Sequence, residues 1–395
     1  MKHSQAVLCA HKSAQASPVA KALAGAAALA VAMGIGRFAF TPVLPMMLQD
    51  AGLSIASGGW LASANYLGYL IGALSAMVLQ VRPERAIHIG LLVIAGTTLA
   101  MGGSETFAVW VALRLLAGMV SAWVLISVSA WCMDTLAVYQ QPFLNSLVFA
   151  GVGAGIAAAG LLCLALGYFA AGSARAWLAL GLLATAVTAL IWRFFARHDA
   201  AAASAAKPGA PAAFVWNTDA LRLVLCYGIF GFGYIIPATF LPVMAKSALQ
   251  GSAAFGWSWP VFGAAAALST LAVAALVRRW GNRRVWMVSH AVMAAGIVLP
   301  VWSQSLPSIF AAALCVGGTF MVITLVALQE ARRVAGAQAR ILIAAMTSAF
   351  AAGQIIGPLT VSAAADGRGF SSGLIVAAVL LASSALLLRN APSGA

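Results

Sequence analysis

The chain has 395 residues, of which 63% are hydrophobic and 8% are charged. Soluble globular proteins contain about 45–50% apolar and about 25% charged residues, so this composition argues against a water-soluble enzyme. The formal net charge is +14, which in a soluble protein would suggest a nucleic-acid partner. Where the charges lie along the chain decides between a basic binding surface and a membrane protein.

Apolar segments of about 20 residues, the length that crosses a hydrocarbon core of roughly 30 Å, follow one another along the chain. We predict twelve membrane-spanning helices, over residues 19–47, 58–80, 86–103, 106–130, 142–168, 175–195, 218–244, 254–277, 285–303, 307–329, 341–364 and 371–389. So many long apolar segments cannot all be buried in one soluble core.

The basic residues are distributed unevenly over the predicted loops. With the N-terminus on the inner side, 17 of the 22 Lys and Arg residues fall in inner segments and 3 in outer segments. This bias follows the positive-inside rule. It predicts a multi-pass protein of the bacterial inner membrane with both termini in the cytoplasm, in contact with lipid and without a nucleic-acid partner.

The chain contains an internal repeat. The segment from Gly34 to Met47 aligns with the segment from Gly231 to Met244 at an offset of 197 residues, with Pro45 matching Pro242. A polar interval rich in Pro, Gly, Ala and Ser separates the two copies, which is linker composition. We therefore predict a tail over 1–18, a six-helix bundle over 19–195, a linker over 196–216, a second bundle over 217–390 and a tail over 391–395.

Two six-helix halves in parallel repeat are typical of the major facilitator architecture, whose substrate site lies near the membrane midplane between the halves. The predicted fold class is thus an all-α membrane protein with twelve transmembrane helices in two six-helix bundles. Paired Gly and Pro residues in the first helix of each half indicate bent, cavity-lining helices or close packing.

Two local motifs resemble those of the major facilitator superfamily. Arg114 stands four residues before Gly118, followed by small residues, as in motif B of that superfamily. The run Arg279-Trp-Gly281-Asn-Arg283-Arg284 resembles its cytoplasmic motif A, although Arg278 stands where that motif usually has Asp. Glu330, near the end of the tenth predicted span, joins this group as a candidate gating residue.

Further segments resemble the bacterial YbfB/YjiJ-like branch of the superfamily. They are the stretch from Gly34 to Pro42, the stretch from Gly59 to Tyr69, and Gly317-Gly-Thr319-Phe-Met. The resemblance covers essentially residues 20–390 and implies an integral membrane transporter that works by alternating access. In that branch the substrate is generally not assigned, so the resemblance says more about fold than about chemistry.

Two arginines, Arg37 and Arg114, fall inside predicted spans, whereas no acidic residue lies well inside any span. A charge at that depth costs at least about 2.5–3.5 kcal/mol, so each must face a wet cavity, a partner or an anion. Arg binds carboxylates through its two-pronged guanidinium, which favours an organic anion as substrate. Snorkelling, or bonding to carbonyls of a bent helix, is the alternative for Arg37, and proton coupling through a midplane carboxylate is disfavoured.

Other polar side chains inside spans are candidates for lining the cavity. Asn65 and Tyr69 (i, i+4), with Tyr66, share a helix face, and Gln354 stands between Gly353 and Gly357-Pro358. Interhelical hydrogen bonding explains them equally well. The candidate substrate or cavity residues are Arg37, Asn65, Tyr66, Tyr69, Arg114, Tyr234, Thr319 and Gln354.

The sequence therefore predicts a secondary active or facilitative transporter of a small solute, functional as a monomer, with no cofactor, no metal and no catalytic residues. A multidrug-type efflux carrier is the main alternative, because the spans are rich in Met and Trp. A membrane sensor on a transporter fold is a further alternative. Substrate, direction of transport and proton coupling are left open.

Overall fold

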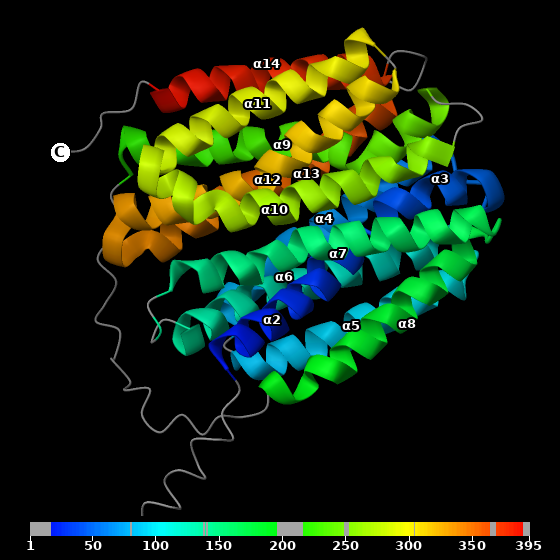
Figure 1. Ribbon diagram of the computed structural model, residues 1–395, viewed down its shortest axis with the longest axis horizontal. Helices are drawn as coiled ribbons and strands as arrows, with labels where there is room; N and C mark the ends of the chain where they lie inside the picture. Colours follow the sequence, from blue (N-terminus) through cyan, green and yellow to red (C-terminus); the bar gives the residue numbers. More distant parts are fainter. Residues whose placement is uncertain are drawn as a thin grey trace, which may run out of the picture.

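A computed structural model describes residues 17–79, 81–136, 139, 141–195, 216–248, 253–303, 305–363 and 369–389, and these residues are almost entirely helical (Figure 1). The predicted tails and linker lie almost entirely outside them. The helices of the N-terminal half are α2 (Pro18–Leu29), η1 (Ala30–Ile35), α3 (Phe40–Asp50), α4 (Ile55–Val78), α5 (Pro83–Gly102), α6 (Phe107–Leu136), α7 (Pro142–Tyr168), α8 (Ser173–Ile191) and η3 (Trp192–Phe195). Those of the C-terminal half are α9 (Thr218–Ala248), η4 (Ala253–Trp257), α10 (Ser258–Trp280), α11 (Asn282–Trp302), α12 (Leu306–Ala335), η5 (Gly336–Gln338), α13 (Ala339–Ala363) and α14 (Gly369–Arg389).

Local sequence explains where several helices begin. The Ser17 and Ser54 hydroxyls cap α2 and α4 by accepting backbone N–H bonds at 3.1 Å, which satisfies a donor that has no partner within the helix. Pro83 and Pro142 stand in the first turns of α5 and α7, where the missing N–H of proline costs nothing. The ends of most helices lie within a few residues of the ends of the predicted spans.

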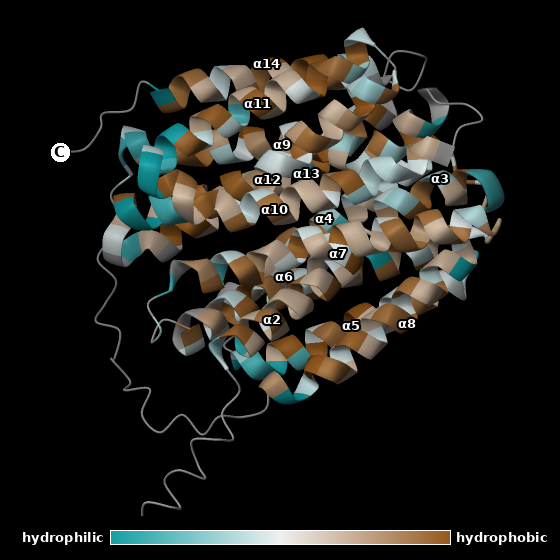
Figure 2. Ribbon diagram, viewed as in Figure 1, coloured by the Kyte–Doolittle hydropathy of each residue, from teal (hydrophilic) through white to brown (hydrophobic). Residues whose placement is uncertain are grey.

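Eleven segments of the described chain are long and apolar enough to cross a membrane. The remaining long helix, α4, has 24 residues, and Asn65, Tyr66 and Tyr69 are polar residues near its middle. Brown and tan residues make up most of the visible helices in Figure 2, whereas the strongest teal gathers mainly at helix ends. Two helices extend clearly beyond their predicted spans: α6 continues to Leu136 and α12 to Ala335. The last turn of α12 carries Arg332 and Arg333 outside the apolar stretch.

The first predicted span is not one regular helix. It begins as α2, passes through the π-helical turn η1 and an irregular turn over residues 36–39, and resumes as α3. Within this stretch the N–H groups of Gly36 and Phe38 reach back five residues, to the carbonyls of Val31 and Met33. Pro42 adds to the irregularity because it lacks an N–H. The interruption leaves helix carbonyls free for side chains of neighbouring helices.

The internal repeat is visible in the packing of the two halves. A Cβ on Gly118 of α6 would lie 2.0 Å from the carbonyl oxygen of Asn65 in α4. At the matching place in the other half, a Cβ on Gly317 of α12 would lie 2.3 Å from the carbonyl oxygen of Phe262 in α10. Asn65 and Phe262 are 197 residues apart, which is the offset of the sequence repeat. The contact of α4 with α6 and the contact of α10 with α12 are therefore equivalent in the two halves.

The two halves meet mainly along two pairs of helices, α7 with α10 and α4 with α13, and α3 also contacts α9. Glycine allows the close approach in the first pair, since a Cβ on Gly153 would lie 2.3 Å from the backbone nitrogen of Ala267. These helix pairs bring residues from distant parts of the sequence to the boundary between the halves.

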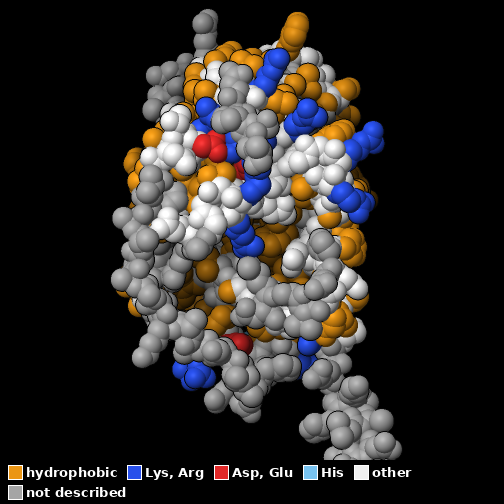
Figure 3. All heavy atoms as spheres, turned by 90° about the vertical axis from the view of Figure 1, so that its left-hand side faces the viewer, with side chains coloured by type: hydrophobic (Ala, Val, Ile, Leu, Met, Phe, Trp, Pro, Cys, Tyr) orange, Lys and Arg blue, Asp and Glu red, His pale blue; other side chains and the backbone are white. Residues whose placement is uncertain are grey.

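The two ends of the molecule differ in charge. At one end, here called the basic end, α2 begins and α14 ends, and α10, α11 and α12 contribute Arg279, Arg284 and Arg333. The other end, where α3 and α9 end, is called the opposite end. Seen from the basic end, blue basic side chains gather mainly in the upper half of the view, above a central hollow in which orange hydrophobic side chains are visible (Figure 3).

Candidate functional site

Arg37 lies in the irregular turn between η1 and α3, at the boundary between the halves, and only 2% of it is exposed. Its Nη2 donates a hydrogen bond of 2.9 Å to Oε1 of Gln354 in α13. Its Nε has no hydrogen-bond partner. The guanidinium is therefore fully buried but only partly satisfied, which is costly for a charged group.

Aromatic rings from the N-terminal half surround the Arg37 guanidinium. Its central carbon lies 4.0 Å from the ring centroid of Tyr69, 5.2 Å from that of Phe38 and 5.5 Å from that of Tyr66. Cation–π contacts with desolvated rings are worth about 2 kcal/mol or more. The rings therefore hold the charge in an apolar setting without neutralising it.

Gln354 connects Arg37 to the C-terminal half. Its Oε1 accepts from Arg37 and its Nε2 donates to the hydroxyl of Tyr234 in α9. The Tyr234 ring is stacked with those of Phe320 and Phe350, at interplanar angles of 3° and 9°. Tyr234 occupies the position in the second half that Arg37 occupies in the first, 197 residues earlier, so the two repeats meet at one amide.

Arg114 and Asn65 hold the interrupted helix in place. Arg114 donates to the carbonyls of Gly36 and Arg37 at 3.2 and 3.1 Å, and Asn65 donates to the carbonyls of Arg114 and Gly36 at 2.8 and 3.3 Å. The guanidinium of Arg114 also lies over the ring of Phe40. Side chains of α4 and α6 thus take the place of the helix donors that the irregular turn lacks.

The two buried arginines have no acidic counterpart among the residues that the structure describes: none of the ion pairs there includes Arg37 or Arg114. Both sites are strongly buried, with 2% of each arginine exposed. Arg114 uses two donors on carbonyls, whereas Arg37 faces side chains at the boundary between the halves. A net positive charge therefore lies at the centre of the molecule.

Hydroxyl groups between the halves also take part: Tyr66 was a predicted candidate, whereas Thr41, Ser63 and Thr239 gave no signal in the sequence. Thr41 donates to the carbonyl of Ala238 at 2.7 Å, Tyr66 shares a 3.0 Å hydrogen bond with Thr239, and Ser63 donates to the carbonyl of Ile355 at 3.2 Å. All of these lie on the opposite-end side of Arg37. Thr and Ser are common in membrane helices, so sequence alone does not distinguish these positions.

Of the other predicted residues, Thr319 uses its hydroxyl within its own helix, donating to the carbonyls of Cys315 and Val316. It lies in α12, the helix that also carries Phe320, which stacks on Tyr234. The residues that the structure brings into one cluster are Arg37, Tyr66, Tyr69, Tyr234 and Gln354, whereas the Thr319 hydroxyl serves its own helix.

The predicted motif at the basic end forms an ion-pair network within the C-terminal half. Arg283 pairs with both Asp219 and Glu330, and Glu330, of which 1% of the side chain is exposed, also pairs with Arg333. Asp219 is the partner that sequence reasoning missed, although an acidic residue in the first turn of a helix is a recognisable stabilising feature. Arg279 and Arg284 are exposed, and Gly281 has a φ of +76° that favours glycine.

The geometry suits binding better than bond making. The described residues contain no group of three or more His, Cys, Asp or Glu side chains that could hold a metal ion. His290, in α11, accepts a hydrogen bond from Trp286 and is completely buried, as is typical of an interior histidine. The central cluster can bind and orient a ligand through one cation, amide and hydroxyl groups, and aromatic faces.

The same arrangement of helices occurs in a solved membrane transporter. The crystal structure of a mutant of the nucleoside transporter NupG superposes with a TM-score of 0.70 at 14% sequence identity, covering 93% of this chain and 99% of the other. At that identity the likeness shows the fold alone. The chain has the fold of a helical membrane transporter.

The family is shown by the sequence itself. Residues 29–389 match the model of the family described as uncharacterised MFS-type transporter YbfB, and the chain belongs to this family. No curated protein matches the chain. The protein is thus a multi-pass membrane transporter of the major facilitator type and not an enzyme, as the sequence motifs predicted.

Proposed function

We propose that this protein is a secondary active or facilitative transporter that moves a small organic anion by alternating access, with Arg37 binding the anionic group. The observation that carries the proposal is the state of the Arg37 guanidinium: it is buried, its Nε lacks a partner, and no carboxylate pairs with it among the described residues. An anionic ligand would supply both the missing acceptor and the missing charge.

Its place between the halves suits this role. Arg37 belongs to the first half and binds Gln354 of the second, so a ligand held here would contact both halves. In a parallel-repeat transporter, moving the halves about such a central site exposes it to one side and then to the other. Tyr66, Tyr69 and Tyr234 would orient the body of the ligand, whereas Asn65 and Arg114 would act by holding the turn that carries Arg37.

We further propose that the twelve long helices all span the bacterial inner membrane, as two six-helix bundles over 19–195 and 217–390, with both termini in the cytoplasm and the monomer as the working unit. The basic end is then the cytoplasmic end, because positive residues are retained on that side. Its exposed arginines are placed to contact anionic lipid headgroups.

The conformation described here would then be closed to the outside. The hydrogen bonds from Thr41, Ser63 and Tyr66 to the other half, together with that from Lys246 to the Pro45 carbonyl at 3.0 Å, lie on the opposite-end side of Arg37. The hollow in Figure 3 is at the basic end. Outward opening would require these bonds to break and the basic ends of the halves to approach each other.

The network of Arg283, Asp219 and Glu330 would support that movement. It joins the beginnings of α9 and α11 to the last turns of α12, so the basic end of the C-terminal half would move as one unit. Arg279, Gly281 and Arg284 lie beside it at the surface, where they can meet the other half or lipid.

A second candidate function, efflux of hydrophobic aromatic compounds, is favoured by the stacked rings near the site. Tyr234 lies against Phe230, Phe320 and Phe350, with ring centroids 5.0–5.7 Å apart. Such a surface suits planar apolar molecules. In this function Arg37 would be a structural element rather than the ligand-binding group.

Counterflow in proteoliposomes containing the full chain tests the two candidates. The panel holds aromatic and aliphatic carboxylates, nucleosides and hydrophobic cations, each with and without a proton uncoupler. We expect exchange of a carboxylate that is lost in Arg37→Gln and partly kept in Arg37→Lys, with Arg175→Gln, an exposed arginine at the opposite end, behaving as wild type. If carboxylate exchange is unchanged in Arg37→Gln, the proposed role of Arg37 is wrong. Exchange of hydrophobic cations would support the efflux function. No exchange with any compound would favour a sensor.

A further inference from the structure

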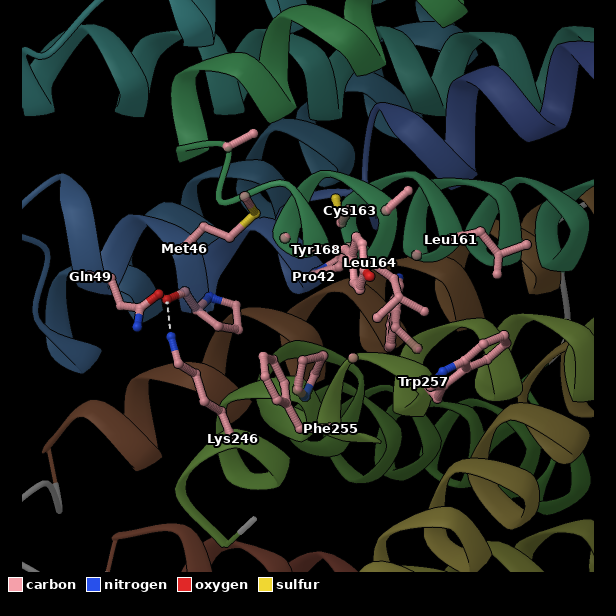
Figure 4. A pocket seen from close by; sticks show the side chains of 18 of the residues that line it. Pro42, Met46, Gln49, Leu161, Cys163, Leu164, Tyr168, Lys246, Phe255 and Trp257 are labelled. Carbon is pink, nitrogen blue, oxygen red and sulfur yellow. Dashed lines mark hydrogen bonds between the residues drawn. The ribbon is translucent and has the colours of Figure 1, made fainter. Parts of the chain in front are cut away.

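A cavity of about 900 Å³ lies between the two halves near the opposite end, with walls from α3, α7, α9, η4 and the start of α10 (Figure 4). Small-molecule pockets occupy roughly 300–1,000 Å³, so it has room for a ligand. Trp259 in its wall packs against Phe38, with centroids 6.4 Å apart, and Phe38 contacts Arg37. An aromatic pair thus stands between this cavity and the central cluster.

The lining of the cavity changes with depth: it is polar at the opposite end of the molecule and apolar farther toward the middle. Gln49, Asp50 and Lys246, which line it, belong to the last turns of α3 and α9, at the opposite end. Pro42 lines the cavity eight residues before the end of α3, about 12 Å deeper at 1.5 Å per residue, and Leu161 is similarly deep in α7. The polar groups lie at the helix ends and the apolar groups toward the middle, which is the order in which a lipid molecule crosses its leaflet.

The two charged groups of the cavity lining, Asp50 and Lys246, differ in how far their hydrogen bonds are already used. Both carboxylate oxygens of Asp50 accept hydrogen bonds from Ser173, at 2.6 Å from its backbone N–H and 2.7 Å from its hydroxyl, so Asp50 holds the beginning of α8. The Lys246 ammonium donates to the carbonyl of Pro45 and has two further donors. In Figure 4 it lies at the Gln49 side of the cavity, away from Leu161 and Trp257.

Two apolar residues of the cavity lining are largely exposed. Leu161 and Trp257 line the cavity, and 45% and 49% of these two side chains are exposed. Leu161 lies well inside α7, at a depth where the surroundings of a spanning helix are acyl chains. The apolar wall that Leu161 and Leu164 form on α7 is therefore deep enough to hold an acyl chain.

We propose that this cavity binds one anionic phospholipid from the leaflet at the opposite end, with its phosphate on Lys246 and one acyl chain along the apolar wall of α7. The proposal rests on the order of polar and apolar lining, on the charge of Lys246 and on the exposed apolar side chains in the lining. Its test measures lipid binding alone, so a negative result would leave the proposed transport function standing.

Native mass spectrometry of the purified, delipidated full chain tests the proposal by counting bound lipids during titration with dioleoylphosphatidylglycerol. Ala165 lines the cavity and is exposed, so Ala165→Trp should fill it and remove one bound lipid. Ala158→Trp, exposed on the same helix but outside the cavity lining, is the matched control and should bind like wild type.

The role of the charge is tested by Lys246→Gln and Lys246→Arg in the same titration. One basic side chain near an anionic lipid surface changes affinity by about five-fold, so Lys246→Gln should weaken phosphatidylglycerol binding by that factor and Lys246→Arg should restore it. Dioleoylphosphatidylcholine should bind more weakly than phosphatidylglycerol, and inorganic phosphate should not compete.

Three outcomes would overturn the proposal. Equal lipid counts for wild type and Ala165→Trp would show that the lipid binds elsewhere. Equal affinity for phosphatidylcholine and phosphatidylglycerol would remove the role of Lys246, and displacement by inorganic phosphate alone would identify a free anion as the ligand. If Ala165→Trp does not fold, the pair of Lys246 variants still decides, because identical affinities for both would contradict the site.

Discussion

The hydroxyl of Thr41 donates a 2.7 Å hydrogen bond to the carbonyl of Ala238, the residue that stands 197 positions later at the equivalent place of the second repeat. Equivalent residues of two repeats can touch only where the axis relating them passes, so α3 and α9 cross at that axis. The bond lies on the opposite-end side of Arg37 and joins the two halves there.

Removal of this bond should favour opening of the opposite end. Thr41→Val keeps the shape of the side chain but loses a hydrogen bond worth about 1 kcal/mol, which shifts a two-state equilibrium by about five-fold. Spin labels at Tyr168 and Trp257, exposed in different halves, should report a larger population of long distances. Thr98→Val is the control because its hydroxyl bonds only within α5, and an unchanged distribution in Thr41→Val would contradict the expectation.

Gln354 should control access of an anion to Arg37. In Gln354→Glu the new carboxylate remains at the acceptor position and pairs with the guanidinium, so the apparent affinity for a transported carboxylate should fall at least about ten-fold. Gln354→Met removes the amide at similar size and should change the affinity by less than about five-fold, the effect of one hydrogen bond. Carboxylate counterflow measures both, and wild-type affinity in Gln354→Glu would contradict the proposed site.

Glu330 should contribute more to stability than its exposed partner Arg333. Glu330→Gln leaves Arg283, of which 14% of the side chain is exposed, with one carboxylate fewer. Removing one partner of a buried pair costs about 3–5 kcal/mol. Arg333→Gln removes a side chain that is 51% exposed, and exposed pairs are worth less than about 1 kcal/mol. Thermal unfolding in detergent should show the larger decrease in Tm for Glu330→Gln, and equal decreases would mean that burial of Glu330 does not matter.

Two adjacent glycines of α12 should respond in opposite ways to alanine. A Cβ on Gly317 would lie 2.3 Å from the carbonyl oxygen of Phe262, whereas a Cβ on Gly318 meets nothing within 4 Å. Gly317→Ala should lower stability by about 1–3 kcal/mol through overpacking, and Gly318→Ala should raise it by up to about 1 kcal/mol through helix propensity. Thermal unfolding compares the two, and a neutral Gly317→Ala would indicate that α10 and α12 can move apart.

The sequence alone was sufficient for the helices and for the repeat. The length of each apolar segment can be compared directly with the thickness of a bilayer. The residues from Gly34 to Met47 have the same spacing of Gly and Pro as the matching segment of the second half. Both signals are local, so no knowledge of the partner helix is needed. The interruption of the first helix was only hinted at, because Gly36 and Pro42 are equally consistent with a simple bend.

The tertiary structure decided which polar groups meet. Arg37 and Gln354 were both candidates, but their contact across 317 positions depends on α13 packing against the N-terminal half. The inter-half roles of Thr41 and Thr239, the pairing of Asp219 with Arg283 and the cavity beside Lys246 likewise depend on distant segments. In a membrane the hydrophobic effect sets the helices, whereas small residues and a few hydrogen bonds set their packing, and those specific contacts leave little trace in one sequence.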